Sequence, residues 1–281
     1  MLRNPGLWPL ALAAAALIPF AQPAAAQNYQ GPPKPTVQDY GPFKNAPYKM
    51  PVTATASGKC GNPAYSCLFY GGDFLYNPLL PSIANALANE DTVVIPGTPY
   101  GAATWVPFTV PAGETWNVLG LFSNNQATYG VLDQGVEPTS AAYWSINEDV
   151  FAGNAGTVVA SGTSAATSTP TGRAAFGLNE YTIEVTGLGV TLSSGTYWMA
   201  VIPICSNSAN PYCSGVFFES DVEYINTPPA NAYGPAEPLD ASFFDSSYFG
   251  VTFEPTNGFV GACGGIGCDA FSAGVLGHIA K

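Results

Sequence analysis

Short runs of β-branched and aromatic residues, separated by glycine, proline and asparagine, make up most of the chain from residue 60 onward. In the segment YTIEVT (181–186) apolar and polar residues alternate strictly, which is the period of a half-buried strand. Residues 115–122 follow 104–110 across the turn sequence PAGE, so we expect these two strands to form a hairpin. The other predicted strands cover residues 92–95, 142–147, 156–162, 190–192, 196–203, 216–225, 248–253 and 270–279.

One segment has a helical pattern instead. Ser82 is a suitable N-cap, and Ile83, Ala86 and Leu87 share one face of a short helix over residues 82–90. The chain is therefore predicted to be all-β, a single β-sandwich or jelly-roll domain of roughly ten antiparallel strands with one short helix. The expected core residues are Trp144, Ile146, Ile183, Val185, Trp198 and Ile202.

The N-terminal residues have the three parts of a secretory signal peptide. Arg3 precedes the apolar stretch 10–20, and three alanines at 24–26 provide a cleavage site. We expect a signal peptide over 1–26, a Pro/Gly-rich extended leader over 27–59 and a disulfide-stapled domain over 60–281. The predicted location is extracellular, with the periplasm as the alternative, and no membrane span is expected after removal of the signal.

The six cysteines form three close sequential pairs. Disulfides persist in exported proteins, and sequential pairing requires the shortest chain closures. The alternative, a thiolate metal site, requires closer cysteine spacing with histidine support, and only the last pair approaches it. We predict the disulfides Cys60–Cys67, Cys205–Cys213 and Cys263–Cys268.

The formal net charge of −12 narrows the range of partners. A surface of this sign repels phosphate backbones and anionic lipids, so nucleic acid is not an expected partner. The partners that remain compatible with this charge are neutral glycans, an extracellular matrix component, cations or a basic protein surface. Arg173 is the only strongly basic residue between Cys60 and Ala280 and lies in a segment rich in Thr, Gly and Ala, predicted to be a loop. Ion pairs are therefore not expected to hold the fold together.

Five sequence motifs of the chain indicate turns and core strands. Four lie between Trp105 and Pro203, namely FTVPAG (108–113), YWSI (143–146), GTVVASG (156–162) and LSSGTYWMA (192–200), and the fifth is DAFSAGVLG (269–277). In these motifs the chain resembles a β-sandwich module of secreted bacterial proteins of unknown function, some of which are anchored. The resemblance implies a fold and assigns no catalytic residue.

Catalytic chemistry has few candidate residues. The only histidine, His278, lies near the end of the chain, so no nucleophile has an evident base and no catalytic residue is predicted. A carboxylate-dependent acid hydrolase, either a glycosidase or an acid peptidase, is the alternative function. Its candidate acids are Glu148, Asp149, Glu180, Glu219, Asp221 and Glu223. The alternation of the last three also fits a solvated face that discourages edge pairing.

Two groups of residues are candidates for binding. Asn147, Glu148 and Asp149 precede a Gly-Asn turn and offer oxygen ligands to a structural calcium ion. The doublets Tyr143–Trp144 and Tyr197–Trp198 each place one ring on either side of a strand. With the tryptophans assigned to the core, Tyr143 and Tyr197 are the predicted outward-facing glycan contacts. The expected function is a secreted non-catalytic module that binds a glycan or a matrix component, or is structural.

Overall fold

The computed structural model describes residues 60, 64–73, 86–90, 101–127, 139–175, 178–204, 217–220, 233–234, 242–246, 250–256 and 271–280. They belong to the unit Gly31–Lys281. The predicted signal peptide, the leader and four of the six cysteines (Cys205, Cys213, Cys263 and Cys268) lie outside the described residues.

The described residues form ten strands and no α-helix, and every strand pair is antiparallel. This confirms the all-β class. The strands are β1 (Ser66–Tyr70), β2 (Ala86–Ala88), β3 (Ala103–Ala127), β4 (Ala141–Glu148), β5 (Thr157–Ala175), β6 (Leu178–Ile204), β7 (Phe217–Ser220), β8 (Phe243–Ser246), β9 (Val251–Pro255) and β10 (Ala273–Ile279).

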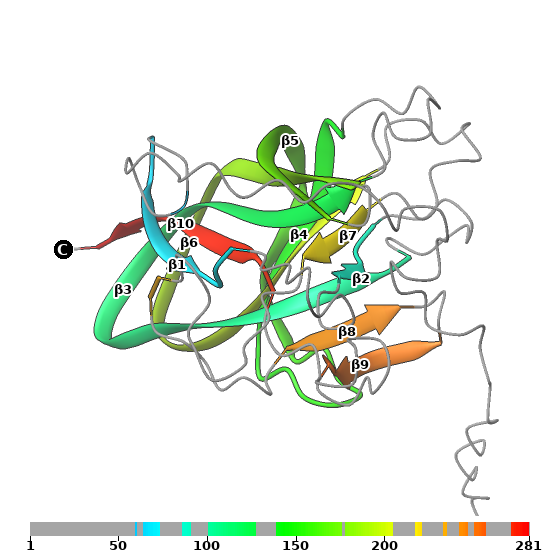
Figure 1. The fold of residues 1–281 in the computed structure, drawn as a ribbon. Coiled ribbons are helices and arrows are strands. Elements are labelled where there is room, and N and C mark those ends of the chain that lie inside the picture. The colour runs from blue at the N-terminus through cyan, green and yellow to red at the C-terminus, as the bar shows by residue number, and fades with distance from the viewer. Residues whose placement is uncertain are drawn as a thin grey trace, which may run out of the picture. The chain divides into compact units, whose positions relative to one another are not determined.

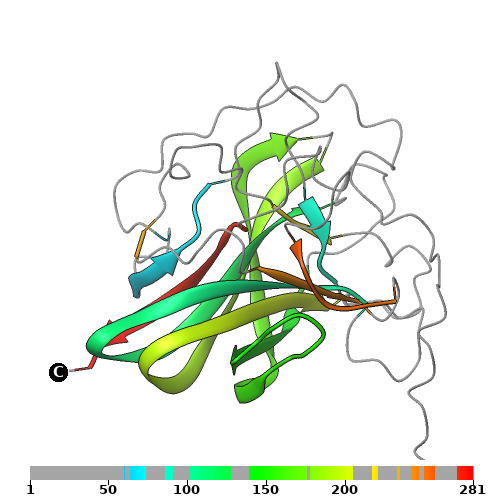
Figure 2. The same ribbon diagram turned by 90° about the horizontal axis from the view of Figure 1, so that it is seen from below.

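Two long strands, β3 and β6, form the centre of the sheet and bend together as one ribbon (Figures 1 and 2). Val110 pairs with Gly195 and Thr115 pairs with Ser193, so β6 is the partner of β3 on both sides of the bend. The predicted hairpin between 104–110 and 115–122 is therefore wrong. The turn-forming residues at 111–114, with Gly113 at φ 83°, bend a continuous strand instead of reversing it.

The sheet order is β1-β10-β3-β6-β4-β5, and the sheet curls because β5 pairs with two strands in succession. Residues 157–165 of β5 pair with β4, whereas residues 166–175 pair with the first part of β6. The short strands β8 and β9 form a separate pair beside the start of β3.

Hydrophobic residues are buried on both faces of this sheet. The first cluster includes Phe108 and Trp116, which come from opposite sides of the bend in β3 and stack with ring centroids 6.2 Å apart. The second cluster contains Trp105 and Phe253, with ring centroids 5.2 Å apart, and lies where β8 and β9 cover the sheet.

The predicted core residues divide between these two clusters. Ile146, Ile183 and Val185 are buried in the first cluster, and Trp144 is partly buried against it. Ile202 is buried in the second cluster and Trp198 packs against it. The expectation of one shared core is wrong because adjacent residues of β4 and β6 face opposite clusters, both of which exclude water.

The predicted helix over 82–90 is also wrong where the structure describes it. Ala86–Ala88 is strand β2, which pairs with Phe218–Ser220 of β7. Asn89 and Glu90, which follow it, are 0% and 3% exposed. Strand pairing and burial therefore override a local helical pattern of only two or three turns. The described ranges contain no helix with the length and hydropathy of a membrane span.

Candidate functional site

Four consecutive polar residues, Ser123–Gln126, form the buried end of β3. Each is 2% exposed or less. Because strand side chains alternate, Ser123 and Asn125 project to one face and Asn124 and Gln126 to the other. On the first face Asn89 donates to Asn125 Oδ1 at 3.1 Å and to the Val201 carbonyl at 2.9 Å, and Ser123 donates to the same carbonyl at 3.0 Å.

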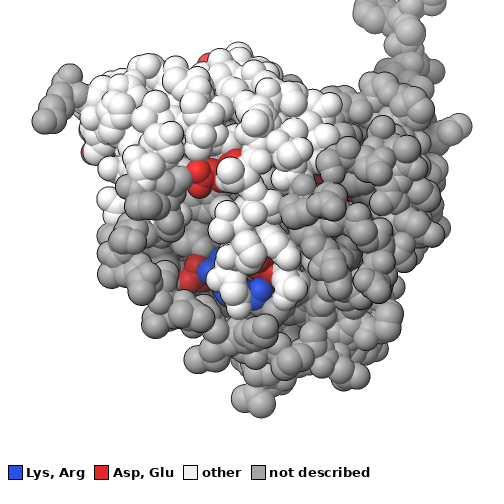
Figure 3. Space-filling model, turned by 90° about the horizontal axis from the view of Figure 1, so that it is seen from above, with Lys and Arg blue, Asp and Glu red and all other residues white. Residues whose placement is uncertain are grey.

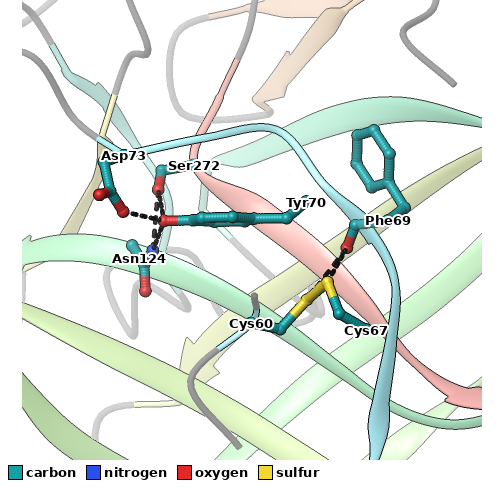
Figure 4. The surroundings of a disulfide bond; sticks show 7 residues. All are labelled: Cys60, Cys67, Phe69, Tyr70, Asp73, Asn124 and Ser272. Atoms are coloured by element: carbon teal, nitrogen blue, oxygen red, sulfur yellow. Dashed lines mark hydrogen bonds between the residues drawn. A yellow bond between two sulfur atoms is a disulfide. The ribbon is translucent and has the colours of Figure 1, made fainter. Parts of the chain in front are cut away.

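The other face carries a hydrogen-bond network centred on Tyr70 (Figure 4). The Tyr70 hydroxyl donates to Asp73 Oδ1 at 2.6 Å and accepts from Asn124 Nδ2 at 3.2 Å. Asn124 also donates to Ser272 Oγ at 2.8 Å and accepts from Thr182 Oγ1 at 2.6 Å. Residues from four separate parts of the chain thus satisfy one another in the interior.

The network continues into a buried ion cluster. Arg173 Nη1 lies 2.6 Å from Asp73 Oδ1, and Arg173 Nε donates to Glu180 Oε2. Glu180 also accepts from Thr171 Oγ1 at 2.7 Å. The exposed fractions of the three charged side chains are 9% for Arg173, 11% for Asp73 and 0% for Glu180.

Two expectations about Arg173 are therefore wrong. It lies in strand β5 rather than in a loop, directly after Gly172, whose φ of 83° accompanies a register shift in the β5–β6 pairing. It also forms ion pairs, because the fold brings two of the abundant carboxylates to the one available guanidinium. On the described part of the face in Figure 3, basic atoms are visible in one place only, beside acidic atoms.

Burial and charge shift the pKa values in this cluster. Burial raises the pKa of Tyr70 far above its ordinary value; Arg173 opposes this shift, and Asp73 and Glu180 add to it. For Arg173, burial acts to lower the pKa, but the charges of Glu180, of Tyr70 in its ionised form and of Asp73 outweigh burial and raise it. Arg173 stays charged and Tyr70 stays neutral, so the cluster is a fixed structural element at ordinary pH.

This cluster has little capacity for acid–base catalysis. Asp73 and Glu180 lie close enough to share one guanidinium, and each also has a hydroxyl donor; Glu180 is fully buried and Asp73 is nearly so. Across the described ranges no group of three or more His, Cys, Asp or Glu side chains could hold a metal ion. His278 is exposed on β10, where Asn117 is within hydrogen-bond distance at 3.1 Å.

The structure does not bring the three predicted calcium ligands together. Asn147 is 1% exposed, and its amide donates to the Ala155 carbonyl at 2.8 Å and accepts from Ser145 Oγ at 2.6 Å. Glu148 is the next residue of the strand and projects to the opposite face. Asp149 is exposed, with a left-handed φ of 55°.

The two predicted glycan contacts differ in their surroundings. Tyr197 is 7% exposed, belongs to the first hydrophobic cluster, stacks on Phe108 and donates to the Ser193 carbonyl at 3.0 Å. Burial, with the charge of Glu148 adding, raises the pKa of Tyr197. The expectation that Tyr197 faces outward is therefore wrong. Tyr143 is partly exposed and packs against the second cluster.

The face that carries Tyr143 is rich in hydroxyl groups. Tyr143 pairs with Thr163, and Ser145 pairs with Ser161, across the β4–β5 ladder. Thr163 and Ser161 are exposed, and Tyr143 and Ser145 are partly exposed. Since directly paired residues share a face, one aromatic ring and three hydroxyl side chains lie side by side with no charge among them. We call these four residues the Tyr143 face.

The remaining predicted residues have mixed outcomes. The disulfide Cys60–Cys67 is present, with Cα atoms 5.3 Å apart. Glu219 lies in β7, opposite Leu87 and Asn125. Asp221 and Glu223 lie outside the described residues.

Sequence reasoning did not identify the Arg173 cluster or the buried polar end of β3. One signal was present in each case. A lone arginine in a chain with many acids is a natural partner for them, and the run SNNQ directly follows a strongly apolar strand segment.

No protein-family model, no curated protein and no solved structure matches this chain.

Proposed function

We propose that this protein is a secreted, non-catalytic binding module that holds a neutral glycan on the Tyr143 face. The observation that carries the proposal is the composition of that face: a partly exposed aromatic ring beside the hydroxyls of Ser145, Ser161 and Thr163. Sugar rings present apolar C–H faces that pack on aromatic rings, and their hydroxyls exchange hydrogen bonds with serine and threonine.

The support of the ring favours binding. Tyr143 packs against the second hydrophobic cluster, which includes Ala200 and Ile202 on the neighbouring strand β6. A ring held in this way loses little conformational entropy when a ligand covers it. The sandwich or jelly-roll assignment and export from the cell belong to the same proposal. The curled sheet around a first hydrophobic cluster and the Cys60–Cys67 disulfide support them.

The charges of the described residues favour binding over hydrolysis. The buried acids Asp73 and Glu180 are both paired with Arg173, and the Tyr143 face has no acid of its own. A glycosidase requires two carboxyl groups facing each other across an accessible bond.

A glycan array combined with measurement of released reducing ends at pH 4–7 tests this function. Binding of an uncharged glycan with no released product is the expected result. Turnover that disappears when one Asp or Glu is replaced would establish the acid hydrolase instead.

A further inference from the structure

The strand β5 lies at one end of the sheet order and exposes a free edge. The Ala166 amide donates to the Ser140 carbonyl at 2.9 Å, which identifies the alternate residues Ser164 and Gly162 as the ones bonded to β4. The residues between them, Ser161 and Thr163, therefore direct their main-chain N–H and C=O groups away from β4. Within the described part of the chain no strand pairs with this edge of residues 157–164.

Apart from a register shift at Val159 in the β4–β5 ladder, this edge lacks the usual protection against pairing. Natural sheets protect exposed edges with charged side chains, proline or a covering segment. Residues 157–169 contain no charged residue and no proline. At the other end of the sheet, by contrast, Tyr70 of β1 exchanges two 2.9 Å main-chain hydrogen bonds with Tyr233.

Exposed apolar side chains accompany the free edge. Val158 is 55% exposed and Val159 is 38% exposed, and both belong to β5. Phe151, in the turn that connects β4 to β5, is 57% exposed. These three residues are three of the four large hydrophobic side chains that are exposed among the described residues, the fourth being Ile279 on β10.

We propose that the edge of β5 pairs with the same edge of a second copy of this chain, in antiparallel orientation about a two-fold axis. With the axis at Gly162, Ser161 of one copy exchanges main-chain hydrogen bonds with Thr163 of the second copy. Thr163 of the first copy does the same with Ser161 of the second. A second copy fits this edge because an antiparallel pair about a two-fold axis matches the outward N–H and C=O groups of Ser161 and Thr163 with each other. Two chains of net charge −12 repel each other, and an uncharged edge is where they approach at the smallest electrostatic cost.

The mass of the purified full chain in solution, measured by analytical ultracentrifugation over a range of concentration and salt, is the primary test. We expect a monomer–dimer equilibrium that tightens as salt is raised, because salt screens the repulsion between the acidic copies. A monomer at every salt concentration, or a dimer that salt dissociates, would overturn the proposal.

Two variants with a matched control locate the interface. Thr163→Pro removes one edge N–H from each copy and should weaken dimerisation about thirtyfold, since two hydrogen bonds are lost per dimer. Thr163→Glu places like charges near the axis and should also give monomer. Thr169→Glu adds the same charge to an exposed position of β5 that lies seven residues from the proposed axis, and should leave the dimer intact. A dimer that survives both changes at Thr163 would place the interface elsewhere.

Discussion

Replacing Arg173 by methionine should destabilise the protein severely at neutral pH. The change keeps much of the side chain's volume but removes the guanidinium that bonds to Asp73 and Glu180. Glu180 would keep the Thr171 hydroxyl at 2.7 Å, and Asp73 the Tyr70 hydroxyl at 2.6 Å. Both buried carboxylates would then lose the guanidinium that pairs with them.

The size of the expected loss of stability follows from the burial of these three side chains. With exposed fractions of 9%, 11% and 0% for the three side chains, water screens the pairs little. Removing one partner from a buried ion pair costs roughly 3–5 kcal/mol. That is a large share of the roughly 5–15 kcal/mol by which a typical domain is stable.

Urea unfolding at pH 7, followed by tryptophan fluorescence, measures the loss. The triple variant Asp73→Asn, Arg173→Met, Glu180→Gln is the control. It removes every charge of the cluster and should recover most of the stability, because neutral groups of similar shape are tolerated where a stranded charge is not. A loss below about 1 kcal/mol for Arg173→Met would show that these pairs behave like exposed surface pairs, and would refute the reasoning.

Three further changes test other parts of the structure. The pKa of Tyr70 in the folded protein is raised above its ordinary value of 10.0, so its contribution to the free energy of unfolding is lost as the pH rises above about 10. Tyr70→Phe removes this hydroxyl and should therefore lose less stability than wild type at alkaline pH. Unchanged alkaline unfolding would contradict the burial of that hydroxyl. Replacing both Cys60 and Cys67 by serine should lower the free energy of unfolding by about 2–3 kcal/mol, and urea titration measures it. Gly277→Ala, whose new Cβ would lie 2.1 Å from a main-chain oxygen of β3, should cost more in thermal denaturation than Gly162→Ala, which meets only a side chain at 3.3 Å. Equal melting temperatures would contradict this close packing.

Much of β4, β6 and β10 could be predicted from the sequence, but β1, β2, β8 and the pairing of the strands could not. Runs of β-branched and aromatic residues between turn residues identified most of β4, β6 and β10, and the alternation in residues 181–186 records which side chains face away from water. It does not record which strand lies alongside. The PAGE sequence at 111–114 satisfies a hairpin turn and a bend equally well, and only the shared partner β6 decides between them.

Prediction of the site residues was limited in a similar way, because a sequence does not show which distant residues meet. Asp73 and Arg173 are 100 residues apart, so no local pattern links them. Tyr197 was assigned outward on the assumption that one face of each strand is wet. The second hydrophobic cluster removes that assumption, since Trp198 packs on one face while Tyr197 is buried on the other. Tyr143 is partly exposed while it packs against the second cluster.

The central claim is that the Tyr143 face binds a neutral glycan, and retention on insoluble polysaccharides tests it most directly. Tyr143→Ala should reduce retention about tenfold or more with little change in fold, whereas Tyr143→Phe should retain most of the binding because the ring is kept. Phe151→Ala, which removes an exposed ring outside the Tyr143 face, is the matched control and should bind as wild type. If the folded Tyr143→Ala variant binds as well as wild type, or wild type is not retained by any neutral polysaccharide, the account of this face is wrong.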